Sequence, residues 1–108
     1  MYATIIKKTG SRAYEESFTV SANGAVSYTS PNLFDKQERT LEVCLPATTN
    51  SIYTLTMKDR SDSWDDGAWI EIKDINDHTV LKYFMTDNSE TVDFSLYSPI
   101  NKNAEWKF

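Results

Sequence analysis

The chain has 108 residues and a formal net charge of −5, with 40% hydrophobic and 25% charged residues. This length supports a single hydrophobic core, so we expect residues 1–108 to form one domain. The negative charge disfavours nucleic acid as a partner, because nucleic-acid binding requires a basic surface. No apolar run approaches the roughly 20 residues that a membrane-spanning helix needs.

Short segments in which apolar and polar residues alternate recur along the whole chain. Turn residues separate them at spacings of about ten residues, and Asn23-Gly24 is a strong hairpin signal. No window keeps a helical period over three turns. The pattern predicts an all-β fold, an antiparallel β-sandwich that is jelly-roll-like and has eight to nine short strands. The predicted strands are 2–7, 13–20, 25–28, 39–45, 53–58, 68–73, 79–85, 91–96 and 104–108.

Three finer expectations concern individual positions in these strands. Residues 79–85 carry apolar side chains on both faces, which predicts a central strand. Tyr14, Phe18 and Val20 are expected to lie on one face of the strand 13–20. Cys44 is the only cysteine, so no internal disulfide is possible, and we expect it to pack under a neighbouring element rather than to act as a reactive thiol.

An acidic loop, residues 59–67, lies between two of the predicted strands and contains four Asp and one Arg. The longer window 59–77 holds seven acids and two bases, and by itself accounts for the net charge of the chain. Carboxylates packed this closely disfavour one another's ionised form unless a cation lies among them. Oxygen-rich loops are also what Ca²⁺ prefers, and Gly67 allows the chain to turn back into the next strand.

The predicted ligands of this Ca²⁺ ion are the four loop aspartates, Asp59, Asp62, Asp65 and Asp66, supplemented by nearby backbone carbonyl groups. Two simpler interpretations stand beside this one. Asp, Ser and Gly are common turn residues, so the loop can be an ordinary solvated turn. Asp59 and Arg60 can also form an exposed salt bridge, which would contribute little.

Trp64 lies within the acidic loop, and Trp69 falls on the polar face of the strand that follows it. An outward Trp offers a flat apolar surface with one hydrogen-bond donor, which suits stacking on a sugar ring or on another protein. We therefore interpret both as ligand-binding residues. The alternative is that one or both fold back over the loop and shield it.

The loop and the strand before it carry a resemblance, in the stretches Tyr53-Thr54-Leu55-Thr56-Met57-Lys58-Asp59 and Asp62-Ser63-Trp64-Asp65-Asp66-Gly67. Together they resemble the D-S-Y-G-D-G-W-N-x-G pattern of calcium-binding β-sandwich modules from secreted and surface proteins of bacteria and protists. Asp59, Asp62, Trp64 and Gly67 match the two Asp, the Trp and the final Gly. Ser63 replaces the middle Gly, Asp65 replaces the Asn, and the loop is one residue shorter between the two Asp.

This resemblance covers about a fifth of the chain and has direct implications for function. It implies a calcium-loaded acidic loop and a role in adhesion, or in the binding of glycans or surface proteins. It also implies an extracellular or cell-surface location. The chain opens directly on Met1 without a signal peptide, which leaves an intracellular location open.

Catalysis is not expected from this sequence. The single His, His78, lies in a polar turn, and no Gly-rich phosphate loop or Cys–His pattern is present. The leading hypothesis is a non-catalytic Ca²⁺-binding module. The alternative is a structural protein whose sandwiches form a homo-oligomer or filament, joined by Ca²⁺ or by pairing the apolar ends Met1–Ile6 and Trp106–Phe108 across subunits.

Overall fold

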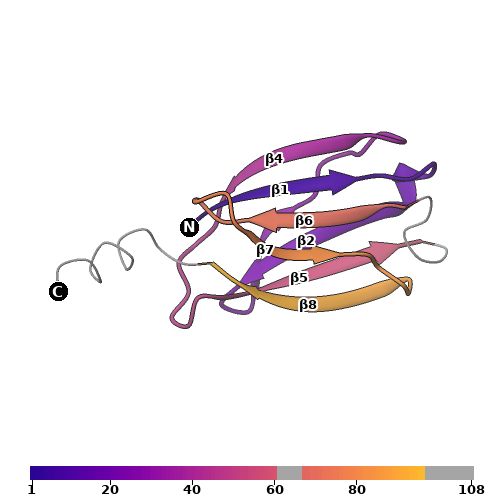
Figure 1. The fold of residues 1–108 in the computed structure, drawn as a ribbon. Helices are drawn as coiled ribbons and strands as arrows, with labels where there is room; N and C mark the ends of the chain where they lie inside the picture. Colours follow the sequence, from indigo (N-terminus) through magenta and orange to yellow (C-terminus); the bar gives the residue numbers. More distant parts are fainter. Residues whose placement is uncertain (61–66, 97–108) are drawn as a thin grey trace.

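The computed structural model describes residues 1–60 and 67–96, which form two antiparallel four-stranded sheets packed face to face (Figure 1). Sheet A has the strand order β4-β1-β6-β7, and sheet B has the order β3-β2-β5-β8. The predicted all-β sandwich is therefore confirmed, with eight strands in the described ranges. The strands are β1 (Tyr2–Lys8), β2 (Glu16–Ala22), β3 (Ala25–Thr29), β4 (Glu38–Cys44), β5 (Ile52–Asp59), β6 (Trp69–Lys73), β7 (Thr79–Tyr83) and β8 (Ser89–Ser95). The ninth predicted strand, 104–108, lies outside the described residues.

One hydrophobic core fills the space between the sheets, because alternate residues of each strand point inward. In β5, for example, Tyr53, Leu55 and Met57 are buried while the residues between them are not. The buried apolar cluster comprises Ala3, Ile5, Phe18, Val20, Ala22, Val43, Leu45, Tyr53, Leu55, Met57, Ala68, Ile70, Ile72, Met85, Phe94 and Leu96. The period-two pattern of the sequence thus identified the inward faces of most strands.

The turn between β2 and β3 follows the hairpin signal of the sequence. Asn23 and Gly24 both have positive φ, 55° and 79°. Two consecutive positive φ values match the twist of a two-residue hairpin, and Asn and Gly adopt them at little cost.

β1 lies in the middle of sheet A and pairs along its length with β4 on one side. On its other side, residues 4–8 pair with β6. Its backbone donors and acceptors are therefore largely used within the chain. The expectation that Met1–Ile6 pairs with another subunit is wrong for this reason.

β7 lies at the edge of sheet A, so the prediction of a central strand at 79–85 is also wrong. The pairing of β7 with β6 shifts in register between Ile72 and Lys73, which leaves one extra residue in β7. The extra residue allows the neighbours Val80 and Leu81 both to pack against the core. A bulge therefore explains why β7 has apolar residues at adjacent positions, and the strand is not buried on both faces.

Two further positions differ from expectation. Tyr14 lies in a short 3-10 turn, η1 (Ala13–Glu15), and its side chain is 69% exposed, because β2 begins only at Glu16. Cys44 ends the edge strand β4 and is exposed rather than packed under a neighbour.

In addition, no helix in the described ranges is long and apolar enough to cross a membrane.

Candidate functional site

Asp59 is the predicted Ca²⁺ ligand that the structure places, at the last position of β5. Its side chain is 6% exposed, because the alternation of β5 turns it inward after Met57. The backbone here is fixed by two hydrogen bonds. The Asp59 amide donates to the Asn88 carbonyl at 2.9 Å, and the Arg60 amide donates to the Glu15 carbonyl at 3.2 Å. The other predicted site residues of the loop, Asp62, Trp64, Asp65 and Asp66, lie outside the described residues.

Asp59 belongs to a cluster of buried charges at this end of the sandwich. Across the strand pair it faces Glu16, and Glu16 forms an ion pair with Lys7 from the opposite sheet. Lys7 Nζ lies 2.6 Å from Glu16 Oε1, and both side chains are fully buried. Lys7 also donates to the Lys8 carbonyl at 2.7 Å, and the Gly10 amide donates to Glu16 Oε2 at 2.9 Å.

The electrostatics of this cluster are dominated by burial. Loss of water lowers the pKa of Lys7, while the hydrogen bond and charge of Glu16 and the charge of Asp59 act in the opposite direction. Two buried carboxylates therefore accompany one buried ammonium group at the base of the acidic loop. Sequence reasoning missed this cluster, although Lys7 and Glu16 both occupy inward positions of their strands.

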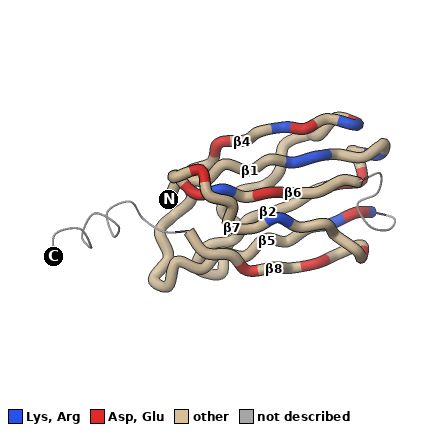
Figure 2. Tube along the Cα trace, viewed as in Figure 1, with Lys and Arg blue, Asp and Glu red and all other residues tan. Residues whose placement is uncertain are grey.

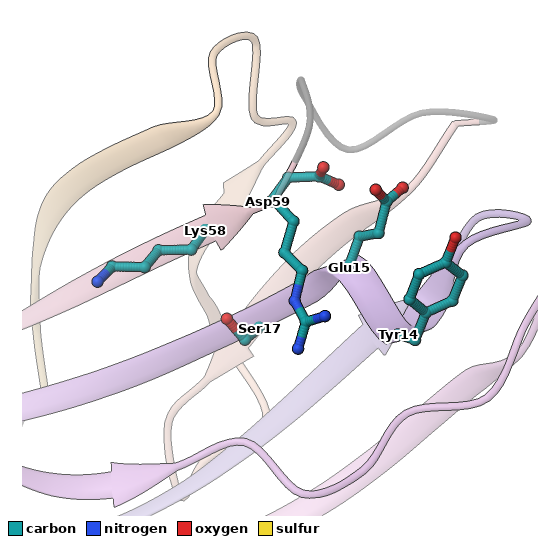
Figure 3. Close-up of a pocket in the computed structure, with 6 residues that line it drawn as sticks. Tyr14, Glu15, Ser17, Lys58 and Asp59 are labelled. Carbon is teal, nitrogen blue, oxygen red and sulfur yellow. The ribbon is translucent and has the colours of Figure 1, made fainter.

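A hollow of about 320 Å³ opens beside Asp59 and is lined by six residues (Figure 3). The carboxylates of Glu15 and Asp59 point to the same side, whereas Lys58 extends away from them along the sheet. Figure 2 shows that Lys and Arg residues also occur at this end of β1, β4 and β5. Acidic and basic residues thus both occur at the rim where the acidic loop begins.

Within the described ranges, no three His, Cys, Asp or Glu side chains come together as a metal site. Asp59 by itself supplies a carboxylate held at a fixed position. A complete set of oxygen ligands would need other groups, and the three remaining predicted ligands follow Asp59 closely in the sequence.

Trp69 begins β6 and points to the outer face of sheet A, where it is half-buried. This is the outward orientation that the strand alternation predicts. The ammonium group of Lys82 lies 4.4 Å from the centre of the Trp69 ring, and 6.0 Å from that of Phe84, which is 54% exposed. Trp69, Lys82 and Phe84 together form an exposed patch of two aromatic rings and a cation.

Compared with known proteins, the chain matches no protein-family model and shows no significant similarity to a curated protein or to a solved structure. The class that the fold defines is an eight-stranded antiparallel β-sandwich in the part of the chain that is described. Arguments about function therefore depend on the residues themselves.

Proposed function

We propose that this chain is a non-catalytic Ca²⁺-binding β-sandwich module that mediates binding to carbohydrate or to a cell surface. The observation that carries the proposal is the position of Asp59. A carboxylate that is 6% exposed stands at the point where β5 passes into a loop with three more aspartates. The three further aspartates add negative charge next to this carboxylate, and carboxylates packed closely disfavour one another's ionised form unless a cation lies among them.

The proposed ligands of the Ca²⁺ ion are Asp59, Asp62, Asp65 and Asp66. Among the described residues near Asp59, Lys7 is the buried cation, and it interacts with Glu16 at 2.6 Å and with the charge of Asp59. A divalent ion would offset the charge of Asp59 and of the loop aspartates together. Extracellular Ca²⁺-binding modules need dissociation constants of only roughly 10⁻⁴–10⁻³ M, which suits the proposed location outside the cell or at its surface.

Addition of Ca²⁺ to about 100 times its dissociation constant should raise the free energy of unfolding by about 2.7 kcal/mol relative to EDTA, because the folded state alone would bind the ion. Chemical denaturation followed by Trp fluorescence in the two buffers measures this difference. Identical unfolding curves in Ca²⁺ and in EDTA would contradict the proposal.

Asn substitutions identify which carboxylates are responsible for the expected stabilisation by Ca²⁺. Asp59→Asn and Asp66→Asn should each abolish most of the Ca²⁺-dependent stabilisation. Asp77→Asn is the matched control, because Asp77 is 83% exposed in the β6–β7 turn and its φ of 65° also suits Asn. Equal losses in Asp77→Asn and Asp66→Asn would indicate a general charge effect instead of a site.

Trp69→Ala should weaken glycan binding about tenfold, since removal of an aromatic anchor typically costs more than 1 kcal/mol of binding free energy. The ligand is first selected on a glycan array, and its dissociation constant is then measured for both proteins. Phe34→Ala is the control, because Phe34 is an exposed aromatic, 61%, in the loop before β4. Unfolding of Trp69→Ala would assign Trp69 to the core, and unchanged affinity would remove it from the binding surface.

The assembly alternative is favoured by one observation, the outer edges of β3, β4, β7 and β8 in the described sandwich. An unpaired strand edge can accept a strand from another subunit. Light scattering with and without Ca²⁺ separates the two functions. A monomer in both conditions would exclude assembly, whereas growth of particles on addition of Ca²⁺ would favour it.

A further inference from the structure

Three hollows on the outer face of sheet B adjoin one another and form a continuous surface, called here the sheet B groove. Their volumes are about 320, 410 and 330 Å³, and Ser17 lines all three. The first two also share Tyr14 and Arg60, and the first and third share Lys58. The shared residues show that the hollows are parts of one groove centred on β2.

The groove exists because small outward side chains form its floor and larger ones its walls. Ser17 and Thr19 of β2 alternate with the buried Phe18, so hydroxyl groups face outward. The wall formed by residues 30–32 is held in place by hydrogen bonds. Ser30 exchanges two of them with the Phe18 backbone, at 2.9 and 3.1 Å, and the Asn32 carbonyl accepts one from Arg39 at 3.0 Å. The groove is therefore largely preformed.

Among the described residues of the groove, the charges that face solvent are positive. Lys58 and Arg60 are both exposed. The three carboxylates in the same walls are buried, with Glu15 8%, Glu16 5% and Asp59 6% exposed. On the same face, Asp93 lies further along the sheet, opposite Thr54, whose hydroxyl donates to it. A ligand in the groove thus meets two cations at one end above a floor of hydroxyl groups.

We propose that the sheet B groove binds an anionic polysaccharide whose sugar rings carry carboxylate or sulfate groups. Lys58 and Arg60 would pair with the anionic groups, and Arg can do so through two parallel hydrogen bonds. The Ser and Thr hydroxyls of the floor can donate to sugar oxygens and accept from sugar hydroxyls. Tyr14, which is 69% exposed, offers a flat ring on which a sugar can stack.

This inference goes beyond the proposed function, because it adds a second carbohydrate-binding surface on sheet B, apart from Trp69 on sheet A. It does not depend on Ca²⁺, since both cations belong to the chain itself. A nucleic acid carries one negative charge per phosphate along its whole length and requires an extended basic surface, whereas the described groove offers two exposed cations.

Three dextrans that share one backbone test the proposal: neutral dextran, carboxymethyl-dextran and dextran sulfate. Binding is measured by calorimetry in EDTA, so that Ca²⁺ plays no part. We expect the wild-type chain to bind the two charged dextrans and not the neutral one. The double variant Lys58→Gln, Arg60→Gln should lose about tenfold or more in affinity, equivalent to a binding free energy of about 1.4 kcal/mol. Lys36→Gln is the control, because Lys36 is exposed in the loop before β4 and lines none of the three hollows.

A second variant keeps the test informative if the double variant folds poorly. Ser17→Glu introduces a negative charge on the exposed floor without removing a wall residue, and should also weaken binding of the charged dextrans. Equal binding of neutral dextran, undiminished binding by both groove variants, or an equal loss in Lys36→Gln would each overturn the proposal. If Ca²⁺ fails to stabilise the chain, the groove proposal still stands. If Ca²⁺ stabilises the chain but the charged dextrans do not bind, only the groove proposal is overturned.

Discussion

Replacement of Lys7 by Met should lower the free energy of unfolding by about 3–5 kcal/mol, because it leaves the carboxylate of Glu16 buried without its cation. Both side chains of this pair are fully buried, and the Nζ–Oε1 distance is 2.6 Å. Glu16 would keep the hydrogen bond from the Gly10 amide, which offsets only part of the loss. Urea denaturation at neutral pH, with wild type as reference, measures the change.

The double variant Lys7→Met, Glu16→Leu shows whether the loss comes from the unpaired charge or from packing. Replacement of a buried ion pair by apolar residues of similar volume is often neutral, or stabilising by about 1–4 kcal/mol. We therefore expect the double variant to recover most of the stability that Lys7→Met loses. A double variant no more stable than Lys7→Met would contradict this account, as would a cost below about 1 kcal/mol for Lys7→Met, the level of an exposed ion pair.

The fold could be predicted because each strand buries alternate residues, and this pattern is local in the sequence. Asn23-Gly24 likewise fixed a hairpin through its own backbone preferences. The edge position of β7 could not be predicted, because Val80 and Leu81 both pack inward only through a bulge formed with a different strand. Register shifts of this kind depend on pairing partners that a single segment does not specify.

The candidate sites depend still more on contacts between distant segments. The orientation of Trp69 followed from alternation within β6, but its contact with Lys82 needed the pairing of β6 with β7. Lys7 and Glu16 could be recognised as polar residues at inward positions, yet they lie in different sheets. The sheet B groove depends on Tyr14 leaving the strand in a 3-10 turn, where the sequence pattern predicted a continuous strand.

Tyr53→Ala should lower the free energy of unfolding by about 3–5 kcal/mol, the range for loss of a large aromatic side chain from a core. Tyr53 is 1% exposed, and its ring lies 5.6 Å from that of Phe94 at an interplanar angle of 22°. The substitution removes this aromatic contact and leaves a cavity between β5 and β8. Urea denaturation measures the loss, and a change below about 1 kcal/mol would mean that the core closes around the gap.

Tyr53→Phe distinguishes the contribution of the hydroxyl group to the free energy of unfolding from the contribution of the ring. The hydroxyl donates to the Pro46 carbonyl at 2.7 Å, and burial raises the pKa of Tyr53, so the phenol remains a donor. We expect Tyr53→Phe to cost only about 1 kcal/mol, the net contribution of a typical hydrogen bond. Because Tyr53 lies on the same strand as Asp59, the pair of variants also tests how far the core supports the loop. If the Ca²⁺-dependent stabilisation that we propose is the same in Tyr53→Ala as in wild type, the proposed calcium site depends on the end of β5 and not on the packing of its beginning.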